Sequence, residues 1–80
     1  MLLCEQGEIM DNKKYIERIK NLREDHDYTQ EYVANYLGTS QTMYARYERG
    51  ANELPIRHLL SLCKLYHVSS DYILGLSNKL

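Results

Sequence analysis

The polar side chains best placed to do chemistry gather between residues 41 and 49, in a stretch that the sequence predicts to be a short helix. One face of that helix would carry Gln41, Thr42, Ala45, Arg46 and Arg49. A glutamine amide can pair bidentately with adenine and an arginine guanidinium with guanine, while the methyl group of threonine can meet that of thymine. Apart from Glu48 at its edge, the face has no acidic residue. This composition is typical of a helix that lies in the major groove of double-stranded DNA.

Two other groupings invite a metal or catalytic interpretation. Cys63 and His67 lie four residues apart on a predicted helix, a spacing that suits two metal ligands. No third or fourth ligand is nearby in the sequence, so a packed cysteine and a surface histidine are favoured. The Asp-His-Asp run at residues 25–27 has no accompanying nucleophile, and we interpret His26 and His58 as solvated side chains. We therefore predict that the protein is not an enzyme and uses no metal and no cofactor.

The polar face depends on two short helices joined by a turn of only three residues. The predicted helices span Gln30–Leu37 and Gln41–Arg49, and so short a turn requires them to cross at a steep angle. Each is preceded by a hydroxyl residue that can cap it and followed by a glycine that tolerates the left-handed conformation. These flanking residues are Thr29 and Gly38 for the first helix, and Ser40 and Gly50 for the second.

Apolar residues mark the faces that would close a core. Between the two short helices these are Val33, Leu37, Tyr44 and Tyr47, with the small Ala34 at the crossing. A preceding helix from residue 11 carries Ile16, Ile19 and Leu22 at three-residue spacing and ends near residues 25–27. A later helix opens at Pro55, and its predicted buried face consists of Ile56, Leu59, Leu60, Cys63 and Tyr66. A last short helix follows Ser69 and ends at Gly75, so the five helices predict an all-α fold.

Length and composition narrow the class of protein. Eighty residues form one small domain, and no apolar run approaches the ~20 residues of a membrane span. The first residues lack the basic and apolar stretches of a signal peptide. Two cysteines, Cys4 and Cys63, are too few for a disulfide scaffold, so we expect a cytoplasmic protein. The formal net charge of −1 counts only weakly against nucleic acid, because a total says nothing about distribution.

The chain divides into three parts. Residues 1–10 are interpreted as a disordered or non-native tail, because they lack a helical period and Met10 would itself be a plausible start. Without the first nine residues, ten basic residues stand against nine acidic ones. Residues 11–76 would form the helical domain, and residues 77–80 a short C-terminal tail that can contribute to a dimer contact.

The order of these features resembles that of the phage-repressor or Cro-like family of helix-turn-helix regulators, also called XRE or lambda-repressor-like. The matching positions in and after the two short helices are Gln30, Ala34, Gly38, Ser40 and the run Glu48-Arg49-Gly50. Later matches are Pro55, Leu59, Leu62 and the run from Val68 to Gly75. Tyr44 departs from the family pattern, in which a β-branched aliphatic residue is usual, and this affects how closely the two helices seat.

The resemblance implies a five-helix DNA-binding domain whose helix-turn-helix is formed by the second and third helices. The residues that would read base edges are Gln41, Thr42, Ala45 and Arg46. Those that would contact the DNA backbone are Gln30, Ser40, Tyr44, Arg49 and Asn52. The family also pairs an arginine of the first helix with the glutamate that ends the third, here Arg23 with Glu48. An exposed pair worth under ~1 kcal/mol is the alternative for these two residues.

These features predict a transcriptional regulator, specifically a repressor, that binds double-stranded DNA as a homodimer on a two-fold operator. One recognition helix reads only a few base pairs, so pairing of two copies is expected. The candidate dimer residues, which could instead close the core of one copy, are Tyr72, Ile73, Leu76 and Leu80. The alternative is a protein-interaction module of the same fold, such as part of an antitoxin or a heterodimerising antagonist of a related regulator. Arg46 and Arg49 favour DNA, and a regulatory protein partner is compatible with either function.

Overall fold

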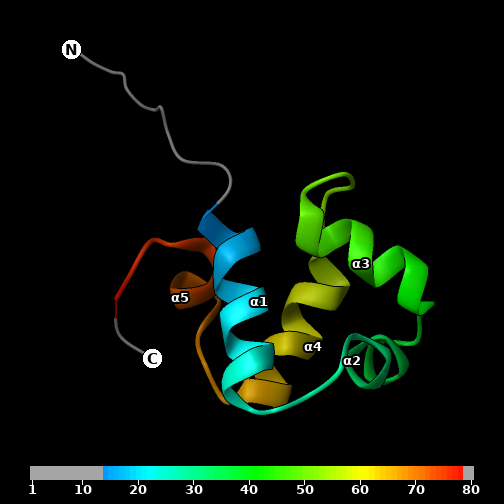
Figure 1. Cartoon of the computed structure of the whole chain (residues 1–80). Helices are drawn as coiled ribbons and strands as arrows, with labels where there is room; N and C mark the ends of the chain where they lie inside the picture. Colours follow the sequence, from blue (N-terminus) through cyan, green and yellow to red (C-terminus); the bar gives the residue numbers. More distant parts are fainter. Residues whose placement is uncertain (1–13, 79–80) are drawn as a thin grey trace.

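Five α-helices follow one another in a computed structural model that describes residues 14–78 (Figure 1). They are α1 (Lys14–Asp25), α2 (Gln30–Leu37), α3 (Gln41–Arg49), α4 (Ile56–Tyr66) and α5 (Ser70–Leu74). The described residues contain no β-strand, so the predicted all-α fold of five helices is confirmed. None of these helices is long and apolar enough to span a membrane. The predicted tail at residues 1–10 and the candidate dimer residue Leu80 lie outside the described residues.

Three hydroxyl side chains cap the first turn of a helix at the positions that the sequence predicts. Those of Thr29, Ser40 and Ser69 each accept a hydrogen bond from the backbone N–H three residues later, at 3.0–3.1 Å. Such a cap satisfies one of the four N–H groups that have no partner at the start of a helix. α4 differs, because Pro55 precedes it and makes no side-chain hydrogen bond. The predicted starts of α2, α3 and α5 are confirmed, whereas α4 begins one residue later than predicted, at Ile56.

α1 packs on two helices that are far from each other along the chain. It contacts α3 and α5, while α2 packs against α3 and α4 (Figure 1). The buried core consists of Ile19, Leu22, Val33, Ala34, Leu37, Tyr44, Tyr47, Leu62, Tyr66 and Ile73. Three of its members are tyrosines, whose rings supply large apolar areas in a chain with no Phe or Trp.

α4 turns a different face to the core from the one that its apolar residues predict. Ile56 and Leu60 are 74% and 54% exposed, so their predicted burial is wrong. The buried positions are His58, Leu62 and Tyr66, which repeat every four residues along one side of the helix. The apolar arc of α4 is wider than the surface that α2 and α5 cover, so part of it stays exposed.

His58 is buried, which corrects the prediction of a solvated side chain. Its imidazole lies edge-on to the ring of Tyr47, with ring centroids 5.8 Å apart. Burial lowers the pKa of His58, and the positive charge of Arg57 lowers it further, so the core accommodates the neutral ring. His26 is exposed as predicted, with its Nδ1 atom 2.8 Å from the carbonyl oxygen of Leu22.

Candidate nucleic-acid interface

The turn between α2 and α3 is fixed by a left-handed glycine. Gly38 has a φ of +79°, and the N–H groups of Gly38 and Thr39 donate to the carbonyl oxygens of Asn35 and Ala34. This hydrogen bonding ends α2 and places Ser40 at the start of α3. Ala34 is fully buried in the helix that packs against α3, in keeping with its small size.

α3 has one buried face and one exposed face. The buried side chains are those of Tyr44, Tyr47 and Glu48. The exposed side chains are those of Gln41, Thr42, Arg46 and Arg49, and Ala45 is half-buried beside them. The structure therefore brings the predicted base-reading residues onto one accessible face, which carries two guanidinium groups and no exposed acidic residue of α3. Contact of these residues with bases remains a prediction.

Tyr44 cannot use its side chain to contact the DNA backbone, because that side chain has no exposed surface. Residue 44 lies on the same side of the helix as Tyr47 and Glu48, which directs all three toward the core. Its ring is edge-on to that of Tyr47, with centroids 6.3 Å apart. Burial raises the pKa of Tyr44 far above its usual value, and the neighbouring Glu48 carboxylate raises it further. The predicted DNA contact of Tyr44 is therefore wrong.

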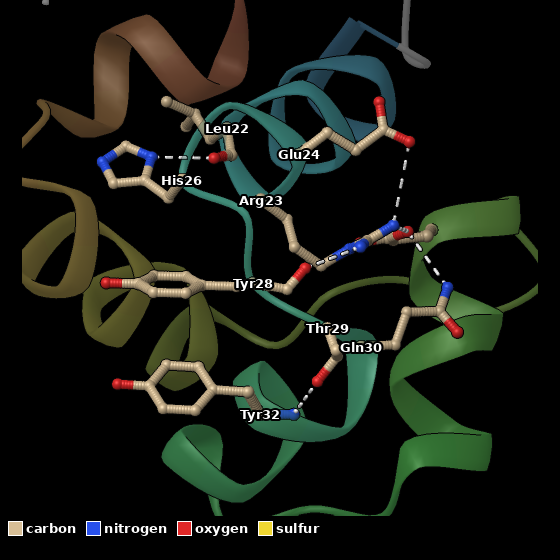
Figure 2. A network of polar contacts seen from close by, with 9 residues as sticks. Leu22, Arg23, Glu24, His26, Tyr28, Thr29, Gln30 and Tyr32 are labelled. Atoms are coloured by element: carbon tan, nitrogen blue, oxygen red, sulfur yellow. Dashed lines mark hydrogen bonds and ion pairs between the residues drawn. The ribbon is translucent and has the colours of Figure 1, made fainter.

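A buried ion pair ties α1 to the inner face of α3. Nε of Arg23 donates to Oε2 of Glu48 at 2.7 Å, and Nη2 donates to Oε1 at 3.1 Å. Nη1 of the same guanidinium donates to the carbonyl oxygen of Tyr28 at 2.9 Å (Figure 2). The two side chains are 14% and 4% exposed, which corrects the alternative of an exposed surface pair. Because a two-pronged contact fixes direction as well as distance, it holds α3 in one rotation about its axis.

The pKa of Glu48 reflects two opposed influences. Burial alone would raise it, but the hydrogen bond from Arg23, the neighbouring Tyr44 hydroxyl and the hydrogen bond from Gln30 outweigh burial and hold the pKa below its usual value. The hydrogen bond with Glu48 raises the pKa of Arg23 in turn. Glu48 is therefore ionised at neutral pH, and its charge is balanced inside the domain instead of facing outward.

Gln30, the first residue of α2, belongs to the same network. Its Nε2 donates to Oε1 of Glu48 at 3.1 Å, and its side chain is half-buried. A glutamine amide has two N–H groups, so the second remains free to donate to a phosphate at the positive end of α2. The Ser40 hydroxyl accepts from the N–H of Met43 and likewise keeps its own hydrogen to donate. Contacts of Gln30 and Ser40 with DNA remain predictions.

Arg46 has a partner that sequence reasoning missed. Its Nε donates to Oδ1 of Asn52 at 2.8 Å. From the sequence, Arg46 was predicted to read a base and Asn52 to contact the DNA backbone, with no link between them. Gly50 is the residue of the sequence that could have indicated this contact. A left-handed residue after a helix turns the following chain back along the last helical turn.

The structure describes three of the predicted dimer residues, Tyr72, Ile73 and Leu76, and they differ in exposure. Ile73 has no exposed surface, so its predicted dimer contact is wrong: it closes the core where α5 packs on α1. Tyr72 is half-buried, and the guanidinium carbon of Arg18 lies 4.1 Å from its ring centroid. Leu76 is 69% exposed and remains available.

An exposed apolar surface on α4 and α5 was not predicted from the sequence. We call it the α4–α5 apolar surface, and its members are the exposed Ile56, Leu60 and Leu74 and the half-buried Leu59. Ile56, Leu59 and Leu60 share one side of α4, being three and four residues apart. Beside them lies a shallow pocket of about 150 Å³ lined by Tyr15, Glu53, Leu54, Leu59 and Leu74. The surface therefore combines projecting side chains with a hollow.

Cys63 and His67 were considered as metal ligands and set aside in the sequence analysis. Cys63 is a free, half-buried cysteine, and burial raises the pKa of its thiol. His67 is exposed at the end of α4, with a φ of +57°. Among residues 14–78, no group of three His, Cys, Asp or Glu side chains could hold a metal ion.

Two short helices joined by a tight turn define a helix-turn-helix domain. A buried ion pair with α1 fixes the inner face of the second of these helices. A family model described as helix-turn-helix matches residues 19–73, and the chain belongs to that family. Curated relatives and the solved P22 c2 repressor confirm the resemblance to phage-repressor-like regulators.

Two curated relatives come from Bacillus subtilis. The HTH-type transcriptional regulator YobD is 39% identical over 64 residues, which make up 80% of this chain and 57% of YobD. The HTH-type transcriptional regulator ImmR is 38% identical over 58 residues, which make up 72% of this chain and 46% of ImmR. The chain thus spans about half the length of these relatives.

Solved structures show the same arrangement of helices. The P22 c2 repressor in complex with synthetic operator 9T matches with a TM-score of 0.71 and 28% identity, over 79% of this chain and 96% of that one. The solution structure of the P22 c2 DNA-binding domain matches with a TM-score of 0.72 and 29% identity, over 89% and 96% of the two chains. A transcriptional regulator from Listeria innocua, with a TM-score of 0.74 and 23% identity over 82% and 62%, supports the fold alone.

Proposed function

We propose that this protein is a transcriptional repressor that binds double-stranded DNA sequence-specifically, with α3 in the major groove. The observation that carries the proposal is the exposed face of α3, where Arg46 and Arg49 stand beside Gln41 and Thr42 without an exposed acidic residue of that helix. The P22 c2 repressor, which shares this fold, binds an operator in its solved complex.

Each exposed residue of α3 has a chemistry that suits one part of the DNA. Gln41 and Arg46 carry the donor and acceptor atoms for bidentate contacts with adenine and guanine. The Thr42 methyl group suits the methyl group of thymine, and Ala45 leaves room for bases to approach. Arg49 and Gln30 supply N–H donors for phosphates, which fix the register of the helix on the duplex.

A second copy of this chain is the proposed occupant of the α4–α5 apolar surface. Ile56 projects beside the pocket that Leu59 and Leu74 line. In a two-fold pair, the projecting side chain of each copy can enter the hollow of the other, as a self-complementary interface requires. The exposed Leu76 can extend the contact. Two recognition helices then read two half-sites, which provides the specificity that a single helix lacks.

The proposed homodimer is tested by sedimentation of the wild type and of Ile56→Asp. A charge placed on the apolar surface should shift the protein to a folded monomer, with a lower thermal midpoint only as far as the lost association stabilised the dimer. Tyr36→Asp is the matched control, because Tyr36 is another exposed apolar residue but lies on α2, outside that surface. A wild type that stays monomeric on operator DNA would contradict the homodimer.

The DNA-binding function is tested by selection from random duplexes, followed by a footprint with Gln41→Ala and Arg46→Ala. We expect protection of a two-fold site that both variants lose and that Lys64→Ala, an exposed substitution on α4, keeps. Affinity should fall steeply as salt rises, because several phosphate contacts release counterions. No selected site, together with a salt-insensitive protein complex, would overturn the proposal in favour of a protein-interaction module.

A further inference from the structure

Arg46 stands on the exposed face of α3 with one edge of its guanidinium already bound. Nε donates to Oδ1 of Asn52 at 2.8 Å. The backbone brings the two residues together: Gly50 has a φ of +78°, and the N–H of Ala51 donates to the carbonyl oxygen of Arg46 at 2.9 Å. The positive φ favours glycine at this position, whereas the Cδ1 atom of Ile16, 2.8 Å from where a Cβ atom would lie, is the end of a side chain that can shift.

We propose that Asn52 is a positioning residue that holds Arg46 ready to read a guanine. The guanidinium has five N–H donors in one plane, and with Nε occupied the outer pair at Nη1 and Nη2 remains. That pair matches O6 and N7 of guanine in the major groove. A side chain anchored before binding loses less conformational freedom when it binds, which favours the correct base. This inference rests on the proposed function of α3.

Arg49 provides the contrast within the same helix. Its side chain is exposed and makes no hydrogen bond or ion pair within the described residues. A guanidinium that is not anchored suits a phosphate, which accepts hydrogen bonds from many directions, whereas a base edge accepts them from few. The anchored Arg46 is therefore the specificity-determining arginine, and Asn52 is what distinguishes it from Arg49.

The two roles considered for Asn52 predict different losses. As a backbone contact, it would support binding to every sequence equally. As a positioning residue for Arg46, it would matter only at the base pair that Arg46 reads. Its Nδ2 group remains available as a donor in either case, so the discriminating observation is preference among bases and not affinity alone.

The test measures affinities for the selected operator and for its three variants at the base pair where Arg46→Ala loses preference. Asn52→Ala should reduce the preference for guanine about five-fold with an unchanged thermal midpoint, and should have no further effect in the Arg46→Ala background. Asn52→Asp keeps the acceptor oxygen, so it should keep the preference while its charge weakens binding to every sequence. Equal weakening on all four sequences by Asn52→Ala, additive with Arg46→Ala, would overturn the inference.

A second measurement needs no DNA and separates this inference from the proposed function. Hydrogen exchange at Nε of Arg46, followed by NMR, should be slow in the wild type and several-fold faster in Asn52→Ala, since a hydrogen bond protects the exchanging N–H. Equal exchange in both proteins would overturn the inference whatever the DNA result. Slow exchange in a wild type that selects no DNA would instead overturn the proposed function, and with it the reading role of the pair.

Discussion

The two faces of α3 differ in how firmly their side chains are held. On the inner face, Tyr44 and Tyr47 pack in the core, and Glu48 is bound by Arg23 of α1. On the outer face, Gln41 and Arg49 project without a partner among the described residues, and Arg46 alone is anchored. In a helix of nine residues, each side chain thus serves either the position of the helix or the surface that it presents.

This difference shows how a small domain can hold a reading surface without a large core. The inner face fixes α3 through Tyr44 and Tyr47, which are buried in the core, and through the buried ion pair of Glu48 with Arg23. The outer face can then vary its side chains at little cost in stability, because exposed substitutions on a helix change the free energy of unfolding by about 0.5 kcal/mol or less. We expect substitutions on the two faces to separate stability from DNA binding.

The largest loss of stability is expected from Tyr44→Ala. Truncating a fully buried aromatic side chain costs about 4 kcal/mol, from lost burial and from the cavity left behind. Tyr44→Phe keeps the ring and removes only the hydroxyl beside the Glu48 carboxylate, so it should cost far less than Tyr44→Ala. Chemical denaturation of both variants measures this, and equal effects would contradict the inward role of the ring.

Glu48→Ala should cost about 3 kcal/mol, because it leaves the Arg23 guanidinium buried without its partner. The pH dependence of the free energy of unfolding provides a second test of this role of Glu48. Since folding lowers the pKa of Glu48, its stabilisation is present above its ordinary value of 4.5 and is lost as pH falls through the lowered folded value. Denaturation midpoints between pH 7 and pH 3 should therefore fall less in Glu48→Gln than in the wild type. Parallel pH curves for the two proteins would show that protonation of Glu48 does not cause the loss of stability at low pH.

On the outer face, Arg46→Ala should lower affinity for the selected operator by about 30-fold, the loss expected for one bidentate base contact. The thermal midpoint should stay within the error of the wild type, since the side chain is exposed. Titration of labelled operator, with denaturation of the same samples, checks both quantities. A joint loss of affinity and stability would break the separation of the two faces.

The smallest effect is expected from Arg49→Ala. As a phosphate contact, Arg49 should contribute a few-fold in affinity that is similar for all sequences, and its removal should reduce the slope of log affinity against log salt by about one. Binding isotherms at four salt concentrations measure this slope. An altered base preference with an unchanged slope would instead make Arg49 a base reader.

Local chemistry explains why much of the fold could be predicted from the sequence. Helix capping is a local interaction between residues a few positions apart, so residue types alone identify the helix ends. This holds for the caps at Thr29, Ser40 and Ser69 and for the left-handed glycine at residue 38. The orientation of α4 could not be predicted in this way. The apolar arc of α4 is too wide to indicate which part of it other helices cover. A histidine is usually expected at the surface, but His58 is buried against the ring of Tyr47.

The candidate site was predictable in outline but not in its connections. The spacing of Gln41, Thr42 and Arg46 on one helical face follows from the sequence alone. The pairing of Arg23 with Glu48 came only from family resemblance, because the two residues are 25 positions apart. The contact of Arg46 with Asn52 depends on how the chain turns after Gly50, which a pattern of residue types does not specify.

The packing of α1 on α5 has a consequence for synthesis on the ribosome. Arg18 of α1 donates to the carbonyl oxygens of Tyr72 and Ser77, 54 and 59 residues further along. α1 therefore emerges first among the described helices and meets this partner only when α5 has followed. Short helices are marginal without tertiary packing, so α2 and α3 gain little from emerging earlier. The nascent chain should stay sensitive to protease until α5 is free, and only then acquire a rigid α3.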